Sequence, residues 1–216
     1  MIVYGRNPVR EALRGRRAVL RVWAQEEGVD PAELERLCGS PDHQGICAET
    51  EPFPYSDAEE LLAAEDALVV CLDEVKDPQN LGSVCRVAEA VGAGVVLPER
   101  RSAEVTPAVC KASAGAVEHL PVARVRNLAD WLRAAKEEGA WVYGAAADAE
   151  VPYDGPDYSG KVVLVLGSEG RGLRPRVVAA CDELVSLPQR GRVGSLNVAT
   201  AAAVLLYGIL QFRRTP

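Results

Sequence analysis

From residue 67 onward, short apolar runs rich in β-branched residues alternate with longer segments of helical periodicity. The apolar runs, which predict strands, are residues 67–72, 94–97, 141–145, 162–166 and 183–187. The periodic segments, which predict helices, are residues 79–91, 106–114, 127–138 and 174–180. This alternation predicts an α/β fold in which helices cover both faces of a parallel sheet. The last segment, residues 196–212, is apolar nearly all round, so we expect a buried helix and a candidate subunit contact.

The first 50 residues predict a smaller α/β unit. It holds a helix opened by Asn7-Pro8, a helix at residues 31–37, and strands at residues 19–24 and 46–49. Pro52 and Pro54 then interrupt regular structure. We therefore expect three parts: a small domain at residues 1–52, a linker at 53–65 and a larger domain at 66–216.

Composition excludes several classes of protein. Hydrophobic residues make up 48% of the 216 residues, which is ample for a core. No apolar run approaches the ~20 residues of a membrane span, and the first residues lack the apolar stretch of a secretory signal. We therefore expect a cytoplasmic protein that does not enter a membrane. Six cysteines without a C-x-x-C pair, and only two histidines, argue against a zinc site and a disulfide framework and predict reduced, mostly buried thiols.

Charge is distributed unevenly along a chain whose net charge is −7. Residues 1–23 carry six arginines and one acid, residues 24–77 carry sixteen acids and two basic residues, and residues 78–216 are nearly balanced. Contact with a nucleic acid would therefore need local basic patches, and the arginine-rich N-terminal segment is one candidate.

The first candidate site motif spans residues 73–86, directly after a predicted strand. Asp77 can cap a helix that begins at Pro78. Asn80 then lies in the first turn, where the helix dipole would also favour a phosphate. An ordinary capped helix explains Asp77 and Pro78, but it does not explain Asn80 and Arg86. In an open parallel sheet, ligands gather at the carboxyl ends of the strands, which is where this motif falls.

The second motif, residues 165–173, runs from a strand into a glycine-rich turn that holds one carboxylate, Glu169. Glycines permit a positive φ and let a ligand approach the backbone. The spacing is G-x-x-G-x-G, which differs from the dinucleotide-binding fingerprint G-x-G-x-x-G, and no G-K-[ST] follows as in a phosphate-binding P-loop.

The third motif, residues 187–199, joins a strand end to the apolar helix through a basic, flexible loop. Ser195 is a candidate N-cap for that helix. A cap alone does not account for Asn197 entering so apolar a helix, or for Arg190 and Arg192 in the loop.

In this order, the three motifs resemble the signature motifs of the SpoU/TrmH family of RNA ribose methyltransferases, within the SPOUT superfamily. The resemblance covers roughly residues 67–212. In addition, residues 4–9 (Tyr-Gly-Arg-Asn-Pro-Val) and 43–45 (His-Gln-Gly) resemble the small substrate-binding domain of the bacterial branch that methylates guanosine in large-subunit (23S) rRNA, the RlmB-like proteins.

The resemblance implies a C-terminal SPOUT domain tied into a deep trefoil knot, together with a small N-terminal α/β substrate-binding domain. It implies a homodimer formed through the knotted domain, with both protomers shaping each active site, and no metal. Gly167, Leu187 and Leu196 would contact the methyl donor, S-adenosylmethionine. The functional polar positions would be Asn80, Arg86, Glu169, Ser195 and Asn197.

The same resemblance marks Arg86 as the catalytic residue. A ribose hydroxyl is barely ionised at neutral pH, so positioning and proton removal must accelerate its methylation. A guanidinium with a pKa above ~12 is a poor base. Two roles therefore stay open: Arg86 takes the proton, or it holds the adjacent phosphate while Glu169 or water takes the proton.

The chain departs from the family pattern in two ways, of which only the second bears on RNA recognition. Gln189 stands where the family usually has methionine. The N-terminal domain is shortened, because residues 25–30 run almost directly into the helix at residues 31–37, as if a helix and a strand were missing.

The leading interpretation is a 2′-O-methyltransferase that acts on a guanosine of 23S rRNA. A tRNA ribose methyltransferase is the alternative with the same chemistry. A non-catalytic RNA-binding or ribosome-assembly protein is the alternative from another class, and the five polar residues argue against it. A dinucleotide-dependent oxidoreductase would rest on the glycines of residues 167–172, and it fails on their spacing.

Overall fold

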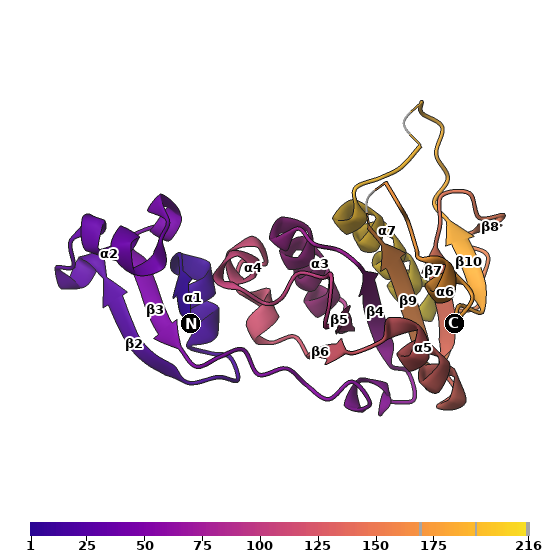
Figure 1. The fold of residues 1–216 in the computed structure, drawn as a ribbon, viewed down its shortest axis with the longest axis horizontal. Coiled ribbons are helices and arrows are strands. Elements are labelled where there is room, and N and C mark those ends of the chain that lie inside the picture. The colour runs from indigo at the N-terminus through magenta and orange to yellow at the C-terminus, as the bar shows by residue number, and fades with distance from the viewer. Residues whose placement is uncertain (169, 193, 215–216) are drawn as a thin grey trace.

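The structure, a computed structural model, describes residues 1–168, 170–192 and 194–214. Its first β-sheet lies at one end of an elongated molecule (Figure 1) and has three antiparallel strands in the order β1-β3-β2. The elements of this N-terminal unit are β1 (Ile2–Tyr4), α1 (Arg6–Ala12), β2 (Val19–Ala24), the 3₁₀ turn η1 (Gln25–Glu27), α2 (Pro31–Cys38), the 3₁₀ turn η2 (Pro41–His43) and β3 (Ile46–Thr50).

The second sheet has seven strands in the order β6-β5-β4-β9-β7-β10-β8, and all of its pairings are parallel. The strands are β4 (Leu68–Asp73), β5 (Gly94–Pro98), β6 (Val122–Val125), β7 (Trp141–Ala145), β8 (Val151–Pro152), β9 (Val162–Gly167) and β10 (Glu183–Ser186). The helices are α3 (Pro78–Ala90), α4 (Pro107–Ala112), α5 (Leu128–Glu137), α6 (Pro175–Val178) and α7 (Val198–Arg214), with 3₁₀ turns η3 (Glu60–Leu62) and η4 (Ala116–Glu118). The predicted parallel α/β fold is confirmed.

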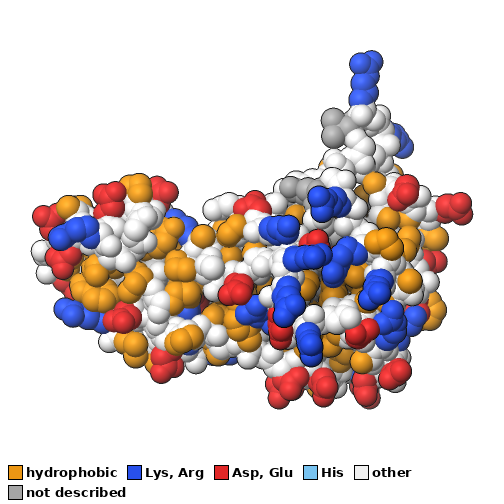
Figure 2. All heavy atoms as spheres, viewed as in Figure 1, with side chains coloured by type: hydrophobic (Ala, Val, Ile, Leu, Met, Phe, Trp, Pro, Cys, Tyr) orange, Lys and Arg blue, Asp and Glu red, His pale blue; other side chains and the backbone are white. Residues whose placement is uncertain are grey.

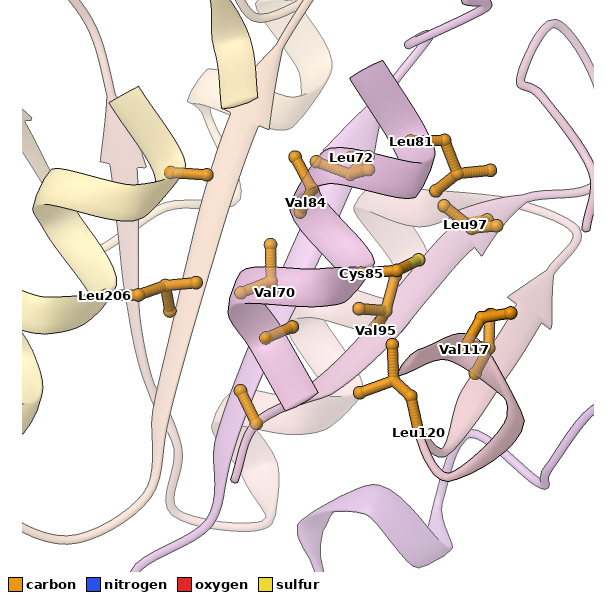
Figure 3. Packing of buried hydrophobic residues seen from close by; sticks show 14 of the residues in the cluster. Val70, Leu72, Leu81, Val84, Cys85, Val95, Leu97, Val117, Leu120 and Leu206 are labelled. Atoms are coloured by element: carbon orange, nitrogen blue, oxygen red, sulfur yellow. The ribbon is translucent and has the colours of Figure 1, made fainter. Parts of the chain in front are cut away.

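Both faces of this sheet carry a core because alternate residues of each strand point to opposite sides. Val70 and Leu72 of β4 belong to one core together with residues of α3 and α7, whereas Val69 and Cys71 belong to a second core together with residues of α5. Figure 3 shows Val84 of α3 and Leu206 of α7 facing the strands in the first core.

Helix α7, which the sequence predicts as a buried helix and a candidate subunit contact, is buried in this chain on one side and exposed on the other. Ala202, Leu206 and Ile209 have almost no exposed surface. Val204 and Tyr207 on the same helix are 41% and 51% exposed. The amino-acid pattern cannot separate these two sides because apolar residues occupy both. The candidate subunit contact at this helix stays a prediction.

A buried ion pair joins the N-terminal unit to the second sheet's helical layer. Arg17, which lies between α1 and β2, donates hydrogen bonds to Glu118 of η4 at 2.5 and 2.9 Å. Both side chains are only 1% exposed. Lys111 of α4 also donates a hydrogen bond to the backbone carbonyl of Asp42. The two units therefore pack directly against each other.

The prediction of elements fails mainly where an element is short. The predicted strand at residues 19–24 matches β2, and the predicted helix at residues 31–37 is one residue shorter than α2. The two-residue strand β8 has too few residues to show a periodicity and was not predicted. Among the described residues, none of the helices is long and apolar enough to span a membrane.

Candidate active site

The central strands β4 and β9 end side by side, so the loops that follow them start at neighbouring points. The last pair in their register joins Asp73 to Gly167. Because the sheet is parallel, β7 and β10 end at the same edge. Ligands of open parallel sheets bind at such an edge. The three motifs, which are far apart in the sequence, therefore meet at one place in the fold.

The glycine-rich turn after β9 folds back on its own start. The backbone N–H of Gly172 donates a hydrogen bond to the carbonyl of Ser168 at 2.9 Å. A Cβ atom at Gly167 would overlap the backbone carbonyl of Gly172, so no other residue fits there without opening the turn. Gly170 and Gly172 have positive φ angles of 78° and 64°, which favour glycine.

A buried carboxylate fixes the far end of this turn. Asp73, whose side chain is fully buried at the end of β4, accepts hydrogen bonds from Arg174 through the backbone N–H at 2.9 Å and the side-chain Nε at 2.7 Å. The next residue, Glu74, has a positive φ of 61° and lies 3.4 Å from the Arg174 guanidinium and 3.5 Å from that of Arg101. The loops after β4 and β9 are therefore held together by charge.

A pocket of about 660 Å³, here called the large pocket, opens at this edge. Its walls come from the ends of β7, β9 and β10, the glycine-rich turn and the start of α7. Gly167, Leu187 and Leu196, which the sequence marks as donor contacts, all line it. Ser195 lines it as well. The structure thus brings these four residues together.

A second pocket of about 310 Å³, the small pocket, adjoins the first, and most of the residues that line it are polar or charged. Ser168, Arg171 and Val198 line both pockets and form their common wall. The other residues that line the small pocket are Glu74, Val75, Lys76, Asp77 and Asn80.

Asn197 connects this site to two helices. Its Nδ2 donates a hydrogen bond to Oδ1 of Asn80 at 2.9 Å. Its Oδ1 accepts hydrogen bonds from the backbone N–H groups of Ala199 at 2.9 Å and Thr200 at 3.3 Å. Asn197 is therefore the residue that caps α7, and the expectation that Ser195 does so is wrong. The helix begins three residues later than Ser195 because the loop crosses the pocket first.

Two predicted site residues, Arg86 and Glu169, are not joined to the pockets by any contact of the described residues. Arg86 lies in α3 with an exposed side chain, and it lines neither pocket. It makes no hydrogen bond or ion pair with the residues that the structure describes. Glu169 lies outside the described residues. The other six predicted residues converge: five line the pockets, and Asn197 joins them through its hydrogen bond to Asn80.

Comparison with known proteins agrees with this geometry. The model of the SpoU rRNA methylase family matches residues 67–207, which are most of the chain. The chain belongs to this family. YacO of Bacillus subtilis, assigned to the TrmH family of tRNA/rRNA methyltransferases, is 38% identical over 237 residues, covering 98% of this chain and 95% of YacO.

Solved structures of SpoU methyltransferases resemble the whole chain. AviRb from Streptomyces viridochromogenes, crystallised with S-adenosylmethionine, has a TM-score of 0.83 and 26% identity, covering 100% of this chain and 91% of AviRb. An rRNA methyltransferase from Sinorhizobium meliloti, also solved with S-adenosylmethionine, has a TM-score of 0.86 and 26% identity, covering 97% of this chain and 86% of that one.

The alignment with YacO spans 237 positions whereas this SpoU family chain has 216 residues. At least 21 of those positions therefore have no counterpart here. The shortened N-terminal domain stays a prediction.

The sequence analysis missed several residues of this SpoU site. They either hold the loops in place or bring a charge to a pocket. Asp73 and Arg174 carry a weak signal, since an acid ends a strand and an arginine ends the glycine-rich turn. Lys76 and Arg171 line the small pocket from loops of unpredictable path. Asp148, which lines the large pocket after β7, lies in a segment without a motif.

The residues of the large pocket fit S-adenosylmethionine. The pocket volume lies within the ~300–1,000 Å³ of small-molecule sites. Apolar side chains such as Leu166 and Leu205 suit a purine ring, and the glycine-rich turn exposes backbone polar groups. The carboxylate of Asp148 suits an ammonium or the hydroxyls of a ribose. The described residues hold no cluster of three or more metal-ligating side chains.

Proposed function

We propose that this protein transfers a methyl group from S-adenosylmethionine to a ribose 2′-hydroxyl of RNA. The observation that carries the proposal is the pairing of two pockets across a common wall of Ser168, Arg171 and Val198. A methyl donor and an acceptor must touch during direct transfer, and this arrangement gives each its own compartment.

The large pocket is the proposed donor site, and its bound ligand supplies a methyl group on a positively charged sulfur. Gly167, Leu187 and Leu196 hold that ligand in the proposal. The clamp between Asp73 and Arg174 keeps the glycine-rich turn in the shape that forms the pocket wall.

The small pocket is the proposed acceptor site. Asn80 and Lys76 lie at the start of α3, where backbone N–H groups and the helix dipole favour a phosphate. In the transfer, the bond from methyl carbon to sulfur breaks, the bond from methyl carbon to the 2′-oxygen forms, and the hydroxyl proton leaves. Arg86, Glu169 and water are the candidate groups at that proton, and Ser195 and Asn197 orient the acceptor.

Arg86 is exposed on α3 and lines neither pocket of this chain. We therefore include a second protomer in the proposal, whose surface would enclose Arg86. The exposed apolar side chains of α7, Val204 and Tyr207, offer a surface for a homodimer through the proposed knotted domain. A partner seated there would complete the acceptor site beside Arg86.

For the RNA, we propose a guanosine of 23S rRNA, recognised with the help of a substrate-binding domain at residues 1–52. The N-terminal motifs at residues 4–9 and 43–45 support it. The name of YacO covers both tRNA and rRNA, so tRNA is the second candidate.

The decisive experiment uses a strain that lacks this gene, with and without complementation by the wild-type gene. Ribose methylation is mapped across all rRNA and tRNA. We expect one 2′-O-methyl mark in 23S rRNA to disappear and to return on complementation. A mark lost from tRNA instead would select the second candidate, and an unchanged map would refute the methyltransferase proposal for cellular RNA.

A further inference from the structure

Charge separates along the strands of the seven-stranded sheet. Exposed acids lie at the edge where the strands begin: Glu59, Glu60, Glu65 and Asp66 before β4, and Glu137 and Glu138 before β7. In Figure 2 acidic side chains gather along the bottom of this part of the molecule, and basic side chains gather above them. Strands β4 and β10 point upward in Figure 1, so the basic groups above them lie toward the edge that holds the pockets. Although the net charge of the chain is −7, the edge of the sheet where the strands end carries exposed positive charge, and we call it the positive face.

Five exposed basic residues, here called the basic rim, follow the strand ends of this positive face: Lys76 after β4, Arg100 and Arg101 after β5, Arg126 after β6, and Arg171 in the glycine-rich turn. Arg101 approaches Glu74 at 3.5 Å and is still 73% exposed. The other four make no ion pair with the described residues. Two acids near the rim are engaged elsewhere, since Asp73 binds Arg174 and Glu104 binds Arg124, and Glu99 is the exposed acid beside Arg100. The side chains of the basic rim are therefore able to bind an anion from outside the protein.

The basic rim starts at the small pocket and leads away from the large one. Lys76 and Arg171 line the small pocket, and Arg101 contacts its Glu74. Because β5 and β6 lie beyond β4 on the side opposite to β9, Arg100 and Arg126 continue the rim outward. Strand β6 is the outermost strand on this side, and Ser56, in the segment that leads to the N-terminal unit, pairs with its Ala123.

In the arginine-rich segment at residues 1–23, the candidate that the sequence offered for RNA, several arginines contact the protein itself. Arg17 is buried against Glu118, and Arg10 pairs with Glu11. Arg16 donates a hydrogen bond to the carbonyl of Leu120 at 2.7 Å. Arg16 and Arg17 hold the two units together, whereas Arg10 pairs within its own helix, so we look for the RNA contact on the basic rim.

We infer that the RNA strand next to the acceptor nucleotide lies across the ends of β5 and β6, with its phosphates on Arg100, Arg101 and Arg126. This inference rests on the proposed function, because it takes the small pocket as the acceptor site. The strand would run from the catalytic edge toward the N-terminal unit, which lets both units hold one RNA at a fixed spacing.

The test compares the double variant Arg100→Gln/Arg126→Gln with wild type. The probe is a fluorescein-labelled single-stranded RNA of mixed sequence, titrated over a series of salt concentrations. Each lost phosphate contact on a single strand reduces the slope of log affinity against log salt by ~0.7, so we expect a slope reduced by roughly 1.4 and a roughly tenfold weaker affinity. Neither residue makes an ion pair with a described residue, so the melting temperature should stay near that of wild type.

Lys161→Gln is the matched control, because it removes a positive charge at the opposite, acidic edge, next to the start of β9. It should bind RNA with the wild-type slope. An unchanged slope and affinity in the double variant would overturn the inference, as would an equal loss in Lys161→Gln.

The two proposals can fail separately. If wild type methylates RNA but the double variant binds it as tightly as wild type, the inferred RNA path is wrong and the proposed function stands. If wild type methylates no RNA while the double variant still loses salt-dependent affinity, the function is wrong and the binding surface stands.

Discussion

The side-chain amide of Asn197 donates a hydrogen bond to the side-chain carbonyl of Asn80 at 2.9 Å, although the two residues are 117 positions apart. Asn197 also caps α7 through its own carbonyl oxygen. One side chain thus links the start of α7 to the first turn of α3, beside the common wall of the two pockets. The Nδ2 donor of Asn197 binds Asn80 at the site, and its Oδ1 acceptor caps α7.

These two roles can be separated by Asn197→Asp. The carboxylate keeps an oxygen for the cap and favours a helix N-terminus, so the melting temperature should stay close to that of wild type. The donor to Asn80 is lost, and we expect methyl transfer to fall by about tenfold. Thermal unfolding and single-turnover methylation measure the two effects. As a comparison, Asn197→Ala should also lose about 1 kcal/mol of stability with the cap. Wild-type activity in Asn197→Asp would show that the hydrogen bond to Asn80 has no part in catalysis.

The glycine-rich turn offers a test of the large pocket with a built-in control. In Gly167→Ala the new Cβ would overlap the carbonyl of Gly172, so the turn must open. We expect affinity for S-adenosylmethionine, measured by calorimetry, to fall at least ~10-fold because the pocket wall moves. Gly191→Ala is the control, since no atom lies within 4 Å of its Cβ position and its φ is not positive. Equal donor affinity in the two variants would contradict the assignment of the large pocket.

Sequence patterns predicted the sheet and the converging motifs because both depend on local periodicity and on residues next to strand ends. Gly167, Leu187 and Leu196 could be placed at one edge, since parallel strands end there together. The partners of Asp73 and Asn197 could not be predicted, because they are set by how loops more than 100 residues apart in sequence fold against each other. The same limit explains the wrong cap at Ser195, since a loop's path decides where α7 begins. Arg17 shows the reverse case: its charge suggested a solvent or RNA contact, and packing buried it.

The thiols should be unreactive in the folded protein. Burial raises the pKa of Cys85 and Cys110 to about 12, and that of Cys47 to about 11. At pH 8 the thiolate fraction of Cys85 is then roughly one part in 10⁴, and the thiolate is the reactive form. Peptide mass spectrometry after iodoacetamide treatment should find half-buried Cys38 modified first. The same treatment in denaturant should modify all six cysteines. Rapid modification of Cys85 in the native protein would show that its helix opens far more readily than its packing implies.

The ion pair between Arg17 and Glu118 should be essential to the docking of the N-terminal unit. In Glu118→Gln the Arg17 guanidinium stays buried without a compensating charge, so we expect a loss of about 3–5 kcal/mol, measured by urea unfolding. Replacing both residues with apolar ones, Arg17→Met/Glu118→Leu, removes the charge as well as its partner and should recover much of that loss. A double variant as unstable as Glu118→Gln would mean that the hydrogen bonds, and not the unpaired charge, account for the effect.

Arg86 is the sharpest test of the catalytic assignment, because its exposed side chain makes no ion pair with the described residues and its loss should leave the fold intact. In Arg86→Ala we expect donor binding to persist while methyl transfer falls at least ~100-fold, the usual scale for a group that handles a proton or holds a reacting phosphate. Calorimetry with S-adenosylmethionine and transfer of a labelled methyl group to rRNA measure the two effects.

Arg133→Ala removes an exposed arginine from α5 and serves as the control. Arg86→Lys distinguishes the two proposed roles: if Arg86 only holds the phosphate, the pH dependence of the rate stays as in wild type, whereas if it takes the proton the dependence shifts, because a lysine amine has a lower pKa than a guanidinium. Near-normal activity in a folded, dimeric Arg86→Ala protein would remove Arg86 from the mechanism and leave the proton to Glu169 or water.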